Sequence, residues 1–233
     1  MEDLDYLKSK DTFLAGTDEV GRGPLAGPVV GCCFLLNNVT KKKVKNLFEF
    51  AQEWEVTDSK KLTQIKRLKI ISALGLNLET IKPSQKLIID IPKVEGLNFS
   101  LTEISHDIID EINILQASLL AMRTSFYKCA EEIDSLFGEV LIDGNKLLKI
   151  EKDNVRETPL VKGDSRSVLI GLSSIVAKEY RDLLMQKLGA KFPGYGLEKH
   201  AGYPTKTHKE SIAKLGPSAI HRKTFKGVKE HLV

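Results

Sequence analysis

The sequence predicts an α/β domain with a mixed β-sheet. Two observations carry this prediction: apolar, β-branched runs of strand length occur in both halves of the chain, and long amphipathic helical patterns follow them. The main segments run strand–strand–strand–helix–strand–strand–helix. No repeat, low-complexity tract or linker interrupts the 233 residues. We therefore expect a single domain over residues 1–233, with a short tail after about residue 227.

The first half of the chain contains three predicted strands. Residues 13–17 form a short apolar strand that leads into Asp18, and residues 28–36 are almost wholly apolar, as expected of a buried central strand. The glycine-rich turn between them predicts an antiparallel pair. Residues 87–94 read as a strand that Pro92 restricts to an edge of the sheet.

The second half adds two strands, and helical spacing marks the remaining segments. Residues 139–143 form an apolar strand that ends at Gly144, and residues 158–161 form another. Apolar residues recur at three- and four-residue steps in the helical segments. The predicted helices are 41–52, 63–74, 108–137 and 165–188.

Composition excludes several classes of protein. The chain is 42% hydrophobic and 28% charged, and 35 basic against 31 acidic residues give a net charge of +4, which permits a polyanionic partner without identifying one. No apolar run approaches the roughly 20 residues of a membrane-spanning helix, and the acidic N-terminus does not resemble a signal peptide. Cys32, Cys33 and Cys129 show no metal-binding spacing. We expect a monomeric cytoplasmic protein with free thiols.

Four acids follow predicted strands. Asp18 and Glu19 follow the first strand, Asp143 closes another, and Asp164 lies between the last strand and a helix. Acids at one end of adjacent strands converge on the crevice where open α/β sheets bind ligands. Successive strand residues point to opposite faces, so Asp18 and Glu19 can share a site only if the strand breaks there, which the following glycines favour.

Crowded carboxylates require a counter-charge, and the hard cations Mg²⁺ and Mn²⁺ prefer oxygen ligands. Two such ions about 4 Å apart are the usual device for phosphodiester hydrolysis. A single ion with a carboxylate general base is one alternative. Another is that the acids are ordinary solvated turn residues without a catalytic role. Asp164 has a further alternative, because Asp before a helix is a common N-cap.

Eight sequence blocks occur in order along the chain. They are DEVGRGPLAGPV at 18–29, DSKKL at 58–62, NILQAS at 113–118, LIDGNK at 141–146, VKGDSRS at 161–167, SIVAKEYRD at 174–182, HAGYPTKTH at 200–208 and HRKTF at 221–225. Together these blocks resemble the ribonuclease HII family, over about residues 11–227. The resemblance implies a ribonuclease H fold with a five-stranded mixed sheet flanked by helices.

The resemblance also implies an activity: metal-dependent hydrolysis on the 5′ side of ribonucleotides in RNA/DNA hybrids and in duplex DNA, leaving 3′-hydroxyl and 5′-phosphate ends, as ribonucleotide excision repair requires. The family's catalytic, metal-binding acids fall on Asp18, Glu19, Asp143 and Asp164. Gly21, Arg22 and Gly23 match the segment that contacts the ribose 2′-hydroxyl, and Tyr203 matches the tyrosine that packs on the sugar at an RNA–DNA junction.

Basic residues cluster beside the acidic blocks. We expect them to hold phosphates, and their removal to weaken the salt dependence of binding. The candidates for substrate binding are Lys60, Lys146, Lys162 and Arg166, together with Lys61 and Lys206. The histidines show no catalytic or metal-ligand spacing, so we interpret His208 and His221 as structural.

Two other functions compete with this interpretation. A ribonuclease HIII-like enzyme would favour long hybrids, but that family usually carries an extra N-terminal domain, and only some ten residues precede the first strand here. A non-catalytic hybrid-binding protein would lack at least one acid. The segment 76–107 is longer than in compact family members, and we expect it to lengthen the third strand and its connection.

Overall fold

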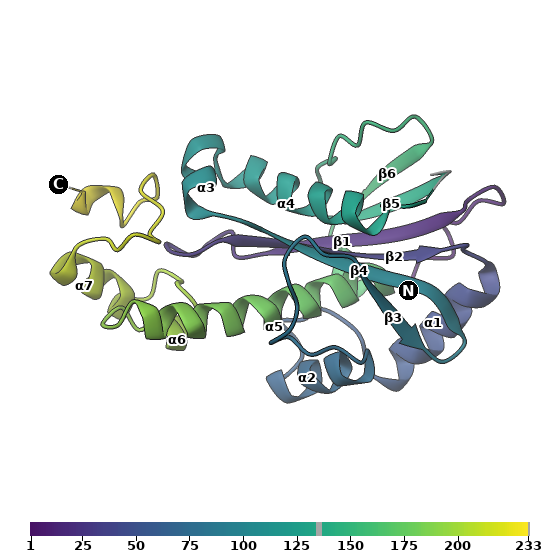
Figure 1. Cartoon of the computed structure of the whole chain (residues 1–233), viewed down its shortest axis with the longest axis horizontal. Helices are drawn as coiled ribbons and strands as arrows, with labels where there is room; N and C mark the ends of the chain where they lie inside the picture. Colours follow the sequence, from purple (N-terminus) through teal and green to yellow (C-terminus); the bar gives the residue numbers. More distant parts are fainter. Residues whose placement is uncertain (134–136, 233) are drawn as a thin grey trace.

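A six-stranded mixed sheet forms the centre of the computed structural model, which describes residues 1–133 and 137–232 (Figure 1). The strand order is β3-β4-β2-β1-β5-β6, and β1 pairs antiparallel with β2 but parallel with β5, which pairs parallel with β6. The strands are β1 (Phe13–Val20), β2 (Val29–Asn37), β3 (Leu87–Ile91), β4 (Val94–Ile104), β5 (Gly138–Asp143) and β6 (Val155–Leu160).

Helices cover both faces of this sheet (Figure 1). One face packs against α4 (Ile114–Cys129), which follows α3 (His106–Ile112). The other face packs against α1 (Lys41–Glu53), α2 (Gln64–Ala73) and the long helix α5 (Val168–Lys191). The alternation of β1 fits this arrangement, because Leu14 faces α5 while Phe13 and Ala15 face α4.

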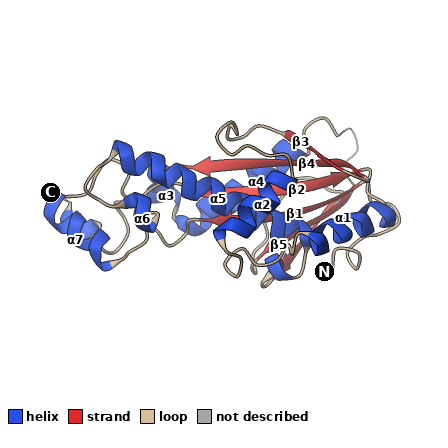
Figure 2. Cartoon of the chain, turned by 90° about the horizontal axis from the view of Figure 1, so that it is seen from below, coloured by secondary structure: helices blue, strands red, loops and turns tan. Residues whose placement is uncertain are grey.

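Two further helices, α6 (Leu197–His200) and α7 (Lys206–Leu215), lie at the end of the molecule opposite the N-terminus (Figure 2). Short 3₁₀ turns form at η1 (Gly163–Ser165) and η2 (Lys229–His231). In the part of the chain that the structure describes, no helix combines the length and apolarity needed to cross a lipid bilayer.

The α/β class and the mixed sheet are confirmed, but the expected count of five strands is wrong. The long segment between α2 and α3 forms a hairpin of two strands, with Pro92 and Lys93 in the turn. Pro92 therefore ends β3, which is an edge strand as predicted. Strand β4 could have been predicted from the sequence, because Leu97, Phe99 and Leu101 alternate with polar residues.

The helix predicted over 108–137 is two helices. Asn113 separates them with a positive φ (66°), and its side chain accepts hydrogen bonds from the N–H groups of Leu115 and Gln116, so it caps α4. The second helix ends at Cys129. Residues 134–136 of the predicted helix lie outside the described residues.

Helix α5 approaches β1 closely. A Cβ at Gly16 would lie 2.6 Å from the backbone nitrogen of Ile170, so only glycine fits between strand and helix. The Ser173 hydroxyl of α5 donates to the Gly16 carbonyl (2.9 Å) and accepts from the Phe34 N–H (3.1 Å). These bonds fix the start of α5 against the sheet beside the strand end that carries the first two acids.

Candidate active site

The four predicted acids meet at one edge of the sheet. Strands β1, β5 and β6 are parallel, so their carboxyl ends share that edge. A cleft of about 580 Å³ opens there. It is lined by Asp18, Glu19, Val20, Gly21, Arg22, Gly23, Ser59, Lys60, Asp143, Asp164, Ser174, Lys178 and Tyr203.

The first strand does not break at its acids, contrary to expectation. It continues to Val20, and Asp18 pairs with Cys32 of β2. The pairing with β5 stops earlier, at Thr17 and Ile142. Beyond that point the edge of β1 is open, so side chains from both of its faces border the same cleft.

The buried carboxyl group of Asp18 is held by two hydrogen bonds. Asp18 is only 6% exposed and accepts from the Glu19 N–H (2.7 Å) and from the Ser174 hydroxyl of α5. The Ser174 hydroxyl lies 2.9 Å from that of Ser59, in the loop before α2. This serine pair fixes the orientation of the carboxyl group, and neither serine was among the predicted site residues.

Asp143 and Asp164 come from β5 and η1. An Asp143 carboxylate oxygen accepts from the Gly163 N–H (2.7 Å), which ties the end of β5 to the turn carrying Asp164. The N-cap of α5 is Ser167 rather than Asp164. Asp164 instead faces the cleft, where it also contacts Asp58, a fifth carboxylate that the sequence analysis did not single out.

The electrostatics of the cleft show a shortage of positive charge. Burial, and then repulsion from Glu19 and Asp143, raises the pKa of Asp18. Burial raises the pKa of Glu19 to about 7, although the Arg22 guanidinium opposes that shift. Burial and repulsion from Asp58 and Asp143 raise the pKa of Asp164 to about 6.

These carboxylates fit a hard divalent cation, because they offer only oxygen donors and are deficient in counter-charge. Among the described residues, no three Asp, Glu, His or Cys side chains form a complete cation site by themselves. Mg²⁺ is commonly bound through one or two carboxylates, with water and substrate phosphate supplying the other ligands. The open arrangement is compatible with that mode.

The predicted substrate-contacting residues line the same cleft as the acids. The Arg22 side chain is 52% exposed and pairs with Glu19 (3.3 Å). Tyr203 is 40% exposed, and its ring lies against Gly23, where an added Cβ would contact the ring at 3.5 Å. A small residue, Gly23, and a flat ring, Tyr203, thus lie side by side in the lining of the cleft.

The predicted basic residues divide into two groups. Lys60 lines the cleft, and Lys146 borders a smaller adjoining pocket that also contains Glu19 and Asp143. Within the described residues, Lys162 and Arg166 line neither the cleft nor the adjoining pocket. Arg166 instead makes two hydrogen bonds to Glu2 (2.7 and 3.0 Å).

Sequence reasoning missed one cleft cation, Lys178 of α5, which pairs with Asp182 (2.7 Å). Its spacing of four residues from Ser174 was the available signal. Residues four apart share one face of a helix, so Ser174 and Lys178 place a hydroxyl and an ammonium group on the same face of α5.

His208 and His221 form a hydrogen-bonded chain behind Tyr203. The Ser218 N–H donates to Nδ1 of His221 (2.9 Å), the two histidine Nε2 atoms are 3.1 Å apart, and Nδ1 of His208 lies 3.0 Å from the Tyr203 carbonyl oxygen. Burial lowers the pKa of His221 to about 4. Both histidines therefore hold structure behind the cleft, and neither lines it.

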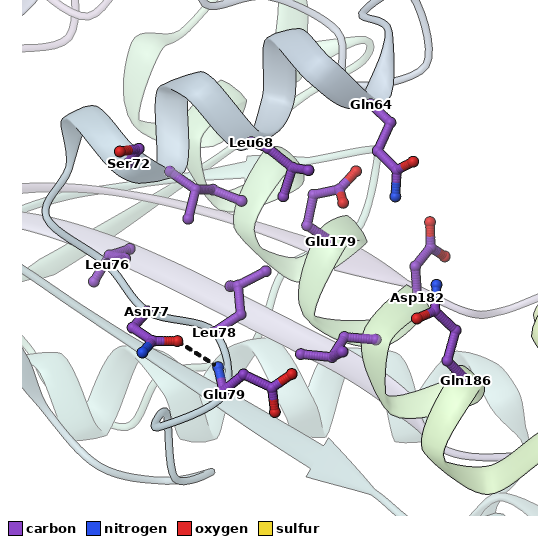
Figure 3. A pocket seen from close by; sticks show the side chains of 12 residues that line it. Gln64, Leu68, Ser72, Leu76, Asn77, Leu78, Glu79, Glu179, Asp182 and Gln186 are labelled. Atoms are coloured by element: carbon purple, nitrogen blue, oxygen red, sulfur yellow. Dashed lines mark hydrogen bonds between the residues drawn. The ribbon is translucent and has the colours of Figure 1, made fainter. Parts of the chain in front are cut away.

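A second pocket, between α2 and α5, differs from the cleft in its charge balance (Figure 3). It has a volume of about 400 Å³ and contains three acids, of which Glu79 pairs with Lys187, Glu179 with Arg67, and Asp182 with Lys178. Because each carboxylate has a basic partner, this pocket lacks the charge deficit of the cleft.

The chain is similar to known proteins over most of its length. A family model described as Ribonuclease HII matches residues 15–228. The chain is 39% identical to Ribonuclease HII from Desulfotalea psychrophila, across 94% of this chain and 83% of that protein. It is also 39% identical to Ribonuclease HII from Geobacter metallireducens, across 98% of this chain and 92% of that protein.

Solved structures share the fold. The ribonuclease H2 from Pyrococcus horikoshii OT3 is similar with a TM-score of 0.64 at 22% identity, covering 94% of this chain and 96% of that one. Bst-RNase HIII in complex with Mn²⁺ is similar with a TM-score of 0.62 at 16% identity, covering 96% of this chain and 70% of that one. At such identities the likeness establishes the fold alone.

Proposed function

Since this chain belongs to the ribonuclease HII family and is an endoribonuclease, we propose that it cuts on the 5′ side of ribonucleotides, both in RNA/DNA hybrids and singly embedded in duplex DNA. The products are a 3′-hydroxyl and a 5′-phosphate. One observation carries the proposal: a single cleft brings together the four acids, the turn at Gly21–Gly23 and Tyr203.

The residues that line the cleft have two different tasks in this proposal. Asp18, Glu19, Asp143 and Asp164 hold Mg²⁺ or Mn²⁺, and such ions, when bound, activate water and stabilise a leaving oxygen. The serine pair keeps Asp18 oriented. Arg22, together with Lys60 and Lys178, supplies positive charge for the phosphates.

Recognition of a lone ribonucleotide depends on its 2′-hydroxyl, the only group that distinguishes it from its neighbours. The backbone at Gly21 and Gly23 approaches a sugar without side chains in the way. Tyr203 offers a flat face that accepts a deoxyribose but crowds a second 2′-hydroxyl. This combination favours an RNA–DNA junction.

The ribonuclease HIII alternative is less favoured. The fold does not separate the two classes, because both kinds of structure are similar to this chain. The family model and the curated relatives are those of ribonuclease HII. The presence of Tyr203 beside Gly23 also favours recognition of a junction over recognition of a long hybrid.

A nicking assay tests the proposal. A labelled DNA duplex with one ribonucleotide, incubated with the protein and Mn²⁺ or Mg²⁺, should be cut 5′ to that ribonucleotide, while the all-DNA duplex stays intact. Asp18→Asn should abolish turnover and largely spare binding. Asp90→Asn, the same change at an exposed residue of β3, is the control and should retain activity. No cleavage with either ion, or equal cleavage of both duplexes, would refute the proposal.

A further inference from the structure

Two arginines are buried directly behind the turn that carries Gly21 and Gly23. Arg181 of α5 is 1% exposed and Arg222, which follows α7, is 0% exposed. Neither has a carboxylate within 4 Å among the residues that the structure describes. A buried charge without an ionic partner is costly unless hydrogen bonds compensate for its lost hydration.

The loop at residues 21–28, called the reader loop here, supplies those hydrogen bonds. Nε and both Nη atoms of Arg222 donate to four of its carbonyl oxygens at 2.7–3.0 Å. A fifth carbonyl accepts from the Arg222 backbone N–H. The side-chain acceptors are the carbonyls of Gly21, Arg22, Pro24 and Gly27, and the fifth is that of Leu25.

Arg181 binds two further carbonyls of the loop and links the loop to the segment before Tyr203. It donates to the carbonyls of Ala26 (3.2 Å) and Pro28 (3.0 Å), and also to that of Ala201 (3.0 Å), two residues before Tyr203. Burial lowers the pKa of Arg181 to about 10 and that of Arg222 to about 9. Both groups are therefore cationic at neutral pH.

This pattern fixes which way the peptide groups face. All peptide bonds in the described chain are trans, so each carbonyl points away from the N–H of the next residue. Because the carbonyls of Gly21 and Arg22 point at Arg222, the N–H groups of Arg22 and Gly23 point away from it. Neither N–H donates to a protein acceptor within the described residues, and both residues line the cleft.

We propose that Arg222, assisted by Arg181, is a positioning residue that turns the carbonyls of the reader loop inward and so presents the N–H groups of Arg22 and Gly23 to a sugar or phosphate in the cleft. This inference rests on the proposed function for its ligand, but the orientation of the loop is a property of the protein alone. A guanidinium is required, because its planar fork reaches several carbonyls at once, whereas a lysine ammonium is a single point charge.

The test is Arg222→Lys, with Arg181→Lys as a second variant should the first not fold. Hydrogen–deuterium exchange of a peptide covering 21–28 should become faster in either variant, while exchange in β5 stays unchanged. The control is Phe126→Leu, which loosens the core on the α4 side of the sheet, remote from the loop. Unchanged exchange in the reader loop would overturn the proposal, whatever the enzyme's activity.

Substrate binding gives a second readout. On an Asp18→Asn background, fluorescence anisotropy compares a duplex with one ribonucleotide against the same duplex of DNA only. Arg222→Lys should reduce that preference by about 10- to 100-fold, as expected when one or two hydrogen bonds from the N–H groups to the ligand are lost, and Phe126→Leu should retain it. A preference kept in full by Arg222→Lys would overturn the proposal. If the unmodified protein fails to nick, the proposed function fails, and the exchange experiment still decides the role of Arg222.

Discussion

Gly21→Ala is the substitution whose cost can be worked out most directly. Gly21 has a φ of 95°, and an added Cβ would overlap Nε of Arg181 and lie 2.7 Å from its Cδ. The positive φ alone costs about 1–2 kcal/mol for a residue with a Cβ. Arg181 cannot move aside cheaply, because three carbonyls hold its guanidinium. Overpacking of this kind adds about 1–3 kcal/mol.

Gly144→Ala is a matched control for this change. Gly144 has a φ of 97°, but nothing lies within 4 Å of an added Cβ, so only the backbone cost of about 1–2 kcal/mol applies. For a chain of this size, each kcal/mol lowers the unfolding temperature by about 2–4 °C. Gly21→Ala should therefore unfold about 2–12 °C below Gly144→Ala in thermal unfolding without cation or DNA. Equal midpoints would refute the packing of Arg181 against the turn.

Three further predictions concern the cleft. Burial and repulsion raise the pKa of Glu19 to about 7 and of Asp164 to about 6, so these acids favour folding when protonated, and the metal-free protein should lose stability as pH rises through about 6–7. Mn²⁺ should raise the unfolding temperature more at pH 8 than at pH 6. An equal rise in unfolding temperature at both pH values would contradict the shortage of positive charge in the cleft. Tyr203→Ala should impair cleavage at single ribonucleotides more than cleavage of long hybrids. Tyr203→Phe keeps the aromatic ring and should keep the preference for single ribonucleotides. Equal losses of Tyr203→Ala on both substrates would reject a role of Tyr203 in junction recognition. Lys178→Met should reduce the slope of log affinity for substrate against log salt concentration by about 1, because one phosphate contact is lost. The control Lys187→Met, at a lysine that pairs with Glu79 of the second pocket, should leave the slope unchanged. An unchanged slope for Lys178→Met would show that Lys178 does not contact a phosphate.

The strands and acids of the site were predictable because their signals are local. Apolar runs mark β1, β2 and β5, and Asp18, Glu19 and Asp143 lie within the last three residues of β1 and β5. The six-stranded count was missed although β4 alternates clearly, because β3 and β4 are joined by a two-residue turn at Pro92 and Lys93 and follow each other almost without interruption in the sequence. The break at Asn113 was missed because the helical spacing of apolar residues continues on both sides of this single residue with positive φ.

The sequence by itself determined the class of fold and the family, with the four acids, the glycine–arginine turn and Tyr203 as site candidates, because short-range periodicity and compact motifs encode them. Only the tertiary structure decided which cations share the cleft: Lys178 lies in it, while Arg166 is bound to Glu2. It alone placed Arg222 behind the reader loop, since that contact joins residues 201 positions apart. Such pairings depend on how strands, helices and loops pack together, and no spacing along the chain records them.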